Sequence, residues 1–412
     1  MIGGAAPRID RLPNGIPVLS HTVPGLRGAA LGLWLLNGSR WEQAGQYGHA
    51  HFLEHILFKG AGALDAAALT ARFEAMGGDV NAMTGRELTA LHGLVPGERL
   101  PELVGLFADM LMAPRFGAAG VARERGVVLQ EMAMVADNPE DLMEQEAVAA
   151  VWPGSGLGRP ILGRVEDLEG LEADTLRAYL AGVACAGRVL VVATGAVDHD
   201  ALMAACAPLA RLPAGPAPFD QPPVWHQGEA HIQGAFRQGQ LAWLMPLPAP
   251  ADPDYAARVL ANHLLGGSWG SRLFQSLRER QGLVYSIHSS LEFNCDSGLW
   301  WIQTACDTAR IDHCRQAVEA EVRRFLEEGP APGELDQARQ HLRAQLALEE
   351  DDADARMGRL AREWFYLGRN PTLEERLAAL DAVAPERIVA VLGTAWRQVS
   401  RFSLGPADAP GG

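Results

Sequence analysis

The sequence predicts an α+β protein built from two similar halves, and three observations lead to this fold class. The chain has 412 residues, of which 48% are hydrophobic and 21% are charged, and chains longer than roughly 250–300 residues usually divide into domains. Near the midpoint, residues 207–224 have a proline density that neither a helix nor a central strand tolerates. Strand and helix patterns follow one another in a similar order on both sides of this segment. We therefore expect two domains of about 200 residues each, joined by an extended linker.

The first half begins with a predicted hairpin over residues 11–25, because Asn14-Gly15 is a strong turn pair. Apolar runs predict a central strand at residues 29–36 and another at 188–192, which ends at Thr194-Gly195. Helical periodicity predicts helices between them at residues 49–58, 66–76, 98–112, 121–135 and 139–151.

The second half has a similar order of predicted elements. We expect a strand at residues 241–247, a helix at 254–265, a glycine-rich turn at 266–270 and a strand at 298–304, followed by long helices. The glycine-rich turn lacks the lysine of a phosphate-binding loop, so a tight turn is the favoured interpretation.

The composition excludes some classes of function. With 35 basic and 50 acidic side chains the net charge is -15, which argues against nucleic-acid binding because phosphate contacts need clustered cations. The most apolar stretch, residues 181–197, is too short and too interrupted by glycine and arginine to span a membrane. The N-terminus lacks the pattern of a signal peptide, so we expect a cytoplasmic protein. A periplasmic location is the alternative if a leader has been removed.

The cysteines are odd in number and scattered through the chain, at Cys185, Cys206, Cys295, Cys306 and Cys314. No two of them have the close spacing of a zinc knuckle or a redox motif, so we expect buried free thiols in a reducing compartment.

The most informative motif is His51-x-x-Glu54-His55, which lies in the first predicted helix. Residues i and i+4 share a helix face, so both imidazoles can reach one metal ion, and Glu54 can reach a water bound to it. This is the inverted form of the zincin motif. The alternative is an exposed helix whose histidines make ordinary hydrogen bonds, since the pentapeptide also arises by chance.

A catalytic zinc ion needs a third protein ligand, and the candidate is Glu131 on the predicted helix at residues 121–135. Glu124 lies seven residues earlier on the same face, where it could accept a hydrogen bond from a ligand histidine. Four other histidines lack the spacing of metal ligands and are expected to be ordinary structural or surface residues: His92, His263, His288 and His313.

Motifs across nearly the whole chain resemble the pitrilysin/insulinase family (M16) of zinc peptidases, in particular its short two-domain members. That group includes the mitochondrial processing peptidase. The matching segments are residues 48–55 with Phe58-Lys59-Gly60, 77–84 with Glu87, 124–131 with Asp137-Asn138-Pro139, 157–163, 266–275 and 277–287. The resemblance implies that each domain is a mainly antiparallel sheet packed with helices. We place the domains at residues 1–206 and 228–412, with a linker at 207–227.

The resemblance also implies roles for individual residues. His51, His55 and Glu131 would bind one Zn²⁺ per chain, and Glu54 would be the general base. Asn81 and Ala82 would lie on an edge strand that pairs with the substrate backbone.

Two residues of the second half match a further pair of the family. Arg278 and Tyr285 would lie over the substrate, with the tyrosine hydroxyl directed at the scissile carbonyl, where it could stabilise a developing oxyanion.

The function implied is a zinc-dependent endopeptidase that cleaves oligopeptides or unstructured polypeptides inside a dimer chamber. One chain carries both the zinc motif and the Arg278/Tyr285 pair, which favours a homodimer over a heterodimer with a related subunit. Two alternatives stay open: a maturation protease for one precursor peptide that works with a partner subunit, and a non-catalytic assembly subunit.

Overall fold

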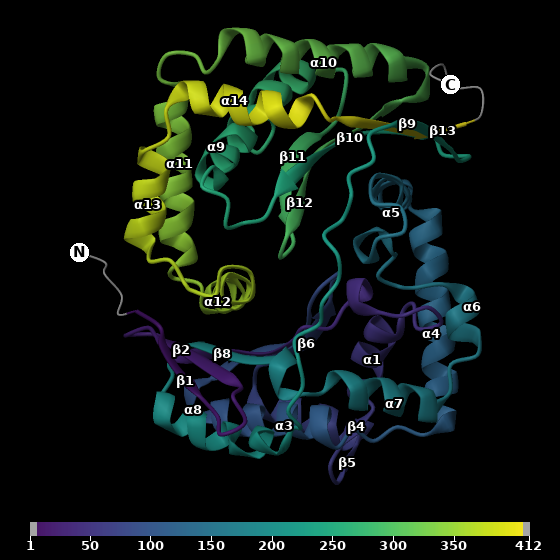
Figure 1. The fold of residues 1–412 in the computed structure, drawn as a ribbon, viewed down its shortest axis with the longest axis vertical. Coiled ribbons are helices and arrows are strands. Elements are labelled where there is room, and N and C mark those ends of the chain that lie inside the picture. The colour runs from purple at the N-terminus through teal and green to yellow at the C-terminus, as the bar shows by residue number, and fades with distance from the viewer. Residues whose placement is uncertain (1–5, 407–412) are drawn as a thin grey trace. The chain divides into compact units, whose positions relative to one another are not determined.

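The computed structural model describes residues 6–406, which form two compact units. The first unit contains the residues up to Ala133 together with Arg159–Gln221 and Leu348–Asn370, and the second contains Met134–Gly158, Pro222–Ala347 and the residues from Pro371 onward. Each unit is a sheet packed with helices (Figure 1), which confirms the predicted α+β class with two similar halves.

The sheet of the first unit has the strand order β1-β2-β8-β3-β7-β6. All neighbouring strands are antiparallel except β2 and β8, which are parallel. The predicted hairpin is β1-β2, and its turn contains Gly15 with a φ of 93°, a conformation that glycine adopts at little cost. The strands are β1 (Arg8–Arg11), β2 (Pro17–Thr22), β3 (Gly28–Leu35), β6 (Asp79–Thr84), β7 (Thr89–Pro96) and β8 (Val189–Gly195).

Side chains of the central strand β3 alternate between two hydrophobic cores, as the pleat of a strand requires. Leu31 and Leu33 belong to the core beneath the helices of the first half, whereas Ala30 and Trp34 belong to a core on the opposite face. The helices of this half that accompany the sheet are α1 (His49–Leu57), α2 (Ala66–Met76), α3 (Leu100–Met112), α4 (Ala118–Asp137), α6 (Val165–Glu169), α7 (Ala173–Val183) and α8 (His199–Cys206).

The opposite face of this sheet is covered by α12 (Ala353–Leu367), a helix from the C-terminal half of the chain. The Trp34 indole donates a hydrogen bond to the Met357 sulfur at 3.3 Å, and Leu360 is buried in the same core. At Gly32 a Cβ atom would lie 2.2 Å from Trp34 Nε1 and 2.5 Å from the Met357 sulfur, so any larger residue would force these side chains to shift.

The second sheet has the strand order β11-β12-β10-β13-β9 and the same pattern of pairing, with β9 and β13 parallel. Its opposite face is covered by α5 (Pro139–Val151), which comes from the N-terminal half and buries Met143 and Val148 against Leu244 and Trp301. The strands are β9 (Glu229–Gln233), β10 (Gln238–Pro248), β11 (Ile287–Phe293), β12 (Ser297–Asp307) and β13 (Ser400–Gly405). The helices are α9 (Tyr255–Leu265), α10 (Ile311–Glu328), α11 (Glu334–Glu349), α13 (Leu373–Asp381) and α14 (Pro385–Trp396), with a short π-helix at Phe274–Arg280.

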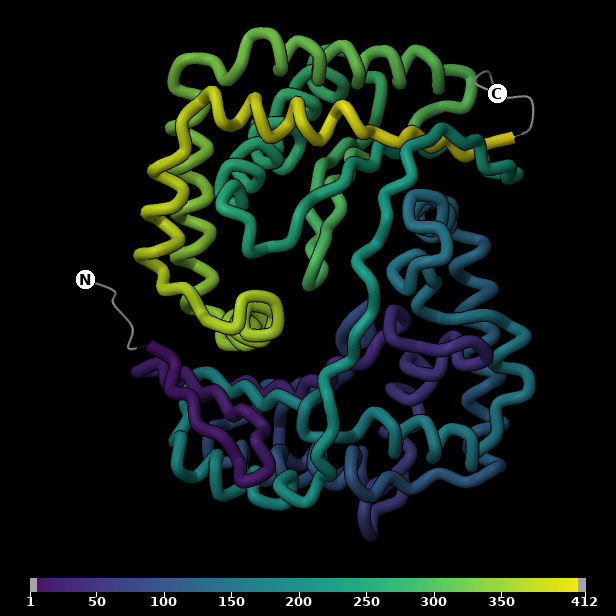
Figure 2. The backbone as a smooth tube through the Cα atoms, viewed as in Figure 1, coloured from purple at the N-terminus to yellow at the C-terminus, as the bar shows by residue number. Residues whose placement is uncertain are grey.

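Each unit therefore takes one helix from the other half of the chain, so neither unit is contiguous in sequence. The proline-rich segment begins with a 3-10 helix at Ala207–Arg211, and residues 213–228 then run without helix or strand (Figure 2). The predicted boundaries at residues 206 and 228 stay a prediction.

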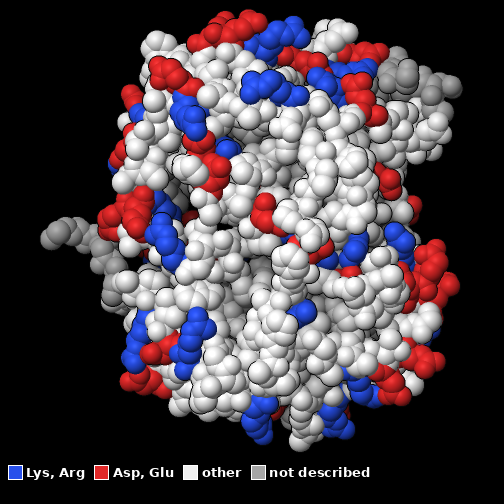
Figure 3. Space-filling model, viewed as in Figure 1, with Lys and Arg blue, Asp and Glu red and all other residues white. Residues whose placement is uncertain are grey.

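Three further features concern the surface and the thiols. Acidic and basic side chains are interspersed on the face shown in Figure 3. All five cysteines are free, and four of them are buried. Among the described helices, none has the length and apolarity needed to cross a membrane.

Candidate metal centre

The first unit positions the His51-x-x-Glu54-His55 motif on α1, and a buried carboxylate fixes the start of this helix. The two carboxylate oxygens of Glu42 accept hydrogen bonds from the backbone N–H groups of Gly48, at 2.9 Å, and Ala50, at 2.7 Å. A carboxylate at this end also complements the helix dipole. Phe52 and Ile56 are fully buried in the core, which fixes the rotation of the helix about its axis.

This rotation brings His51 and His55 of α1 together with Glu131 of α4. The Nε2 atoms of His51 and His55 lie 3.7 Å and 3.5 Å from the same oxygen of Glu131, Oε2. The imidazole centroids are 4.7 Å apart. One ligand atom from each of the three residues lies within 4.8 Å of the others, so one ion can contact all three. The structure thus gathers the three side chains that the sequence singled out.

Glu124 lies behind this group and contacts one imidazole. Its Oε2 is 3.3 Å from His55 Nδ1, and its Oε1 is 2.8 Å from Lys59 Nζ. When His55 donates its Nδ1–H to the carboxylate, the lone pair of the ring lies on Nε2, the atom that faces Glu131. Lys59 neutralises the carboxylate from the other side, and the orienting role of Glu124 stays a prediction.

The donor set fits a zinc ion. Two imidazole nitrogens and one carboxylate oxygen are the ligands of a three-residue catalytic zinc site, which keeps its fourth position for water. Burial, and to a smaller extent the neighbouring His55, lowers the pKa of His51 to about 4, so that the ring is neutral near pH 7 and able to ligate. His51 Nδ1 is buried without a hydrogen-bond partner among the described residues.

Glu54 lies on α1 between the two histidines in sequence and is partly buried. Burial raises the pKa of its carboxyl above the ordinary value, whereas a hydrogen bond from the Thr84 side chain opposes this shift. His55, Glu131 and His92 are close enough to affect its charge. A carboxylate with a raised pKa beside a metal site is suited to accept a proton from water and return it later.

Asn81 and Ala82 lie on β6, which ends the order of described strands in this sheet and pairs only with β7. The Asn81 side chain is exposed, and its Oδ1 accepts a hydrogen bond from the Ala82 N–H at 2.9 Å. The outer edge of β6 is thus unpaired among the described strands, and its last residue, Thr84, contacts Glu54. An edge strand of this kind can accept an extended peptide.

Arg278 and Tyr285 belong to the second unit, where they contact each other. Arg278 Nε donates to the Tyr285 carbonyl oxygen at 2.9 Å, and its guanidinium carbon lies 5.0 Å from the centroid of the Phe274 ring. Tyr285 is 85% exposed, so its hydroxyl is free to reach a ligand. The assignment of this pair to the substrate site stays a prediction.

The sequence reasoning missed two residues of the centre. No sequence motif around Glu42 indicates a contact with α1, and only the folded structure shows that its carboxylate accepts hydrogen bonds at the start of this helix. Burial raises the pKa of Glu42 to about 7, although the backbone hydrogen bonds from Ala50 and Gly48 and the charge of Arg159 oppose the shift. Thr84 ends the segment at residues 77–84 that matches the family. Its position at the end of the expected edge strand is the sequence feature that could have indicated its contact with Glu54.

The chain is similar to known proteins over nearly its whole length. Residues 18–165 match the family model described as insulinase (peptidase family M16), and residues 170–342 match the model described as the peptidase M16 inactive domain. An uncharacterized zinc protease of Mycobacterium tuberculosis is 32% identical over 397 residues, which cover 94% of this chain and 90% of that protein. An uncharacterized zinc protease of Streptomyces coelicolor is 30% identical over 410 residues, covering 97% and 89%.

A solved structure agrees with the fold. The crystal structure of a peptidase M16 inactive domain from Pseudomonas fluorescens superimposes with a TM-score of 0.90 at 23% identity, covering 98% of this chain and all of that one. This likeness concerns the arrangement of helices and strands.

Proposed function

Because the chain belongs to the insulinase family, peptidase family M16, we propose that it is a zinc-dependent endopeptidase that uses the centre on α1 and α4. The observation that carries this proposal is the gathering of His51, His55 and Glu131 within reach of one ion. Relatives that cover most of the chain are named zinc proteases, which supports the same reaction class.

The residues divide the work of peptide hydrolysis. A bound zinc ion supplies Lewis-acid polarisation and lowers the pKa of its water toward about 7. Glu54 accepts the proton of the attacking water and then donates it to the leaving amine. Glu124 and Lys59 hold His55 in the orientation that presents its Nε2 lone pair.

The substrate is an oligopeptide or an unstructured polypeptide. The open edge of β6 supports this class, because a strand added beside Asn81 and Ala82 needs an extended backbone with free N–H and C=O groups. A folded substrate would have to release such a segment before binding. In this proposal Arg278 and Tyr285 contact the bound peptide, and the tyrosine hydroxyl stabilises the oxyanion.

The working assembly is a homodimer that encloses the substrate, with one zinc ion per chain. The proposal follows the two-domain members of the family and the presence of both residue sets in one chain. Light scattering after size-exclusion chromatography tests it: a homodimer doubles the mass of the chain, whereas a monomeric mass contradicts it. Co-purification of a related subunit from the native host would favour the heterodimer instead.

A non-catalytic assembly role is less well supported. A structural subunit has no need for three ligand side chains around one point, nor for a carboxylate of raised pKa beside them. A dedicated maturation protease would use the same centre, so it differs from the proposal only in its range of substrates.

The experiment that tests the proposal is a peptide-library digest with the purified chain. We expect cleavage that a chelator abolishes and that stoichiometric Zn²⁺ restores. Cleavage of many unrelated peptides supports a broad peptidase, and cleavage of one sequence motif alone supports the maturation role. Cleavage that survives complete removal of metal would contradict the metal-dependent mechanism.

A further inference from the structure

The two units are built on the same topology, which makes their helices comparable. Along the chain, α1 follows β3 and precedes β6 in the first unit, and α9 follows β10 and precedes β11 in the second unit. In the sheet orders β3 corresponds to β10, and β6 corresponds to β11. In the same way α4 and α11 each precede the helix that packs on the other sheet, α5 and α12 respectively. The second unit therefore has α9 and α11 as the counterparts of the two helices that carry the metal centre.

These counterpart helices also bring two imidazoles together. His263 of α9 and His341 of α11 have ring centroids 4.8 Å apart, close to the 4.7 Å between His51 and His55. His263 is buried, with an exposed fraction of 8%. Neither imidazole takes part in any hydrogen bond among the described residues. A buried imidazole without a hydrogen bond has a lone pair that is free for a ligand.

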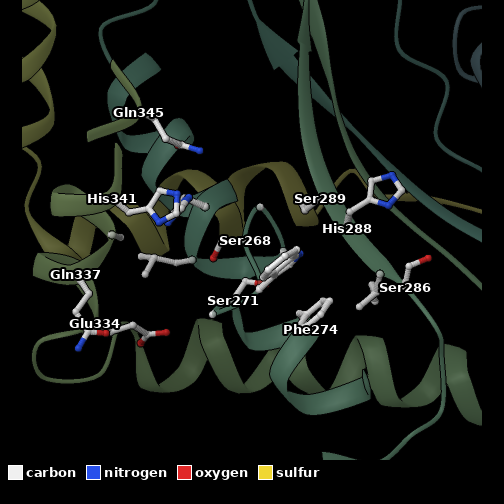
Figure 4. Close-up of a pocket in the computed structure, with 18 residues that line it drawn as sticks. Ser268, Ser271, Phe274, Ser286, His288, Ser289, Glu334, Gln337, His341 and Gln345 are labelled. Atoms are coloured by element: carbon white, nitrogen blue, oxygen red, sulfur yellow. The ribbon is translucent and has the colours of Figure 1, made fainter. Parts of the chain in front are cut away.

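Both rings line a pocket of about 630 Å³, together with the glycine-rich turn at residues 266–270. Gln337 and Gln345, one helical turn before and after His341 on α11, line the same pocket. Figure 4 shows His341 and Gln345 on one side of the pocket and His288 on the other side. The pocket is large enough for an ion and its waters, because a cavity of about 10–15 Å³ on the same measure already holds one water.

The chemistry of the available donors limits the ligand. The one carboxylate in the pocket, Glu334, is already engaged, since both of its oxygens accept hydrogen bonds from Arg272 at 3.1 Å and 2.8 Å. Two imidazole nitrogens and neutral amide oxygens remain. Imidazole suits zinc, cobalt, nickel and copper, whereas calcium and magnesium require oxygen ligands and negative charge. Burial, and then the neighbouring His341, lowers the pKa of His263 to about 4, so this ring is neutral near pH 7.

We propose that the second unit binds a divalent transition-metal ion between His263 and His341, as a second metal site in addition to the one on α1 and α4. Amide oxygens of the α11 glutamines and water complete its coordination. The site binds more weakly than the first, because it lacks a carboxylate ligand and the negative charge that a carboxylate supplies.

Cobalt binding to the metal-stripped full chain tests this proposal. Equilibrium dialysis over a range of free Co²⁺, with elemental analysis of the protein, should show a tight ion and then a weaker one. His341→Ala should keep the tight ion and weaken the second by more than about tenfold, while His55→Ala should do the reverse. Because His341 is exposed, its replacement leaves the core intact. A replacement of the buried His263 could also disturb the core, so His341 is the residue to change.

His288→Ala is the matched control, because His288 lines the same pocket at a distance from the pair. It should bind two ions with unchanged affinities. A single ion per wild-type chain up to millimolar cobalt would overturn the proposal. So would a second ion that is bound equally well by the His341→Ala and His288→Ala proteins.

Discussion

His55 Nδ1 lies 3.3 Å from Glu124 Oε2, and the other oxygen of the same carboxylate is 2.8 Å from Lys59 Nζ. One carboxylate thus contacts an imidazole of α1 and also pairs with Lys59, which lies just after the end of α1. This contact connects His55, the last residue of the His51-x-x-Glu54-His55 motif, to α4 independently of Glu131.

Replacement of Glu124 by glutamine should therefore weaken zinc binding without removing a ligand. Loss of such an orienting partner typically costs 10–100-fold in metal affinity, and we expect a loss of about that size in competition titrations with a chromophoric chelator. Gln130→Ala, an exposed change on the same helix, is the control and should bind zinc normally. Equal affinity of the two variants would show that the His55–Glu124 contact does not tune the site.

Thr84 should set the lower pH limit of activity through Glu54. The Thr84 hydrogen bond opposes the rise of the Glu54 pKa that burial causes, so Thr84→Val should raise that pKa further. A larger fraction of Glu54 is then protonated at a given pH and unable to accept a proton. We expect the acidic limb of the kcat/KM profile to move to higher pH in Thr84→Val and to stay in place in Thr84→Ser. An unchanged profile in the valine variant would separate Thr84 from the base.

Glu42 should make folding stability depend on pH. Burial raises the pKa of Glu42 from an ordinary value of 4.5 to about 7, so between these values the folded chain holds a proton that the unfolded chain has released. Stability then falls as the pH rises from 4.5 to 7, by up to about 3 kcal/mol from this group. Urea denaturation across this range should show a shallower fall in Glu42→Gln than in the wild type. Parallel curves for the two proteins would assign the pH dependence to other groups.

Much of the fold follows from local sequence patterns. The helices at 66–76 and 139–151 have the bounds that their helical periodicity predicts, and the structure shows that the side chains of Asp65 and Asn138 cap their N-termini. The edge strand β6 has no comparable pattern, since its residues alternate only between exposed and half-buried positions. Its place came from the family resemblance.

Long-range contacts were beyond the sequence patterns. Periodicity identifies the helix at residues 139–151 but does not tell that Val148 packs against the sheet of the other half of the chain. The same applies to the candidate metal centre, where spacing singles out the candidate ligands on α1 but Glu42 is recognisable only from the folded contacts. His263 and His341 lie on different helices, so a search for close spacing overlooks them.

The most direct test of the catalytic assignment is a paired measurement of zinc content and peptide cleavage in Glu54→Gln, with Glu131→Ala beside it. We predict that Glu54→Gln retains one zinc ion per chain and loses at least about a hundredfold in kcat, since a positioned general base contributes roughly 10²–10⁴-fold. Glu131→Ala should lose zinc, because it removes one of three ligands. Cleavage at the wild-type rate by zinc-loaded Glu54→Gln protein would contradict the assignment of Glu54 as the base.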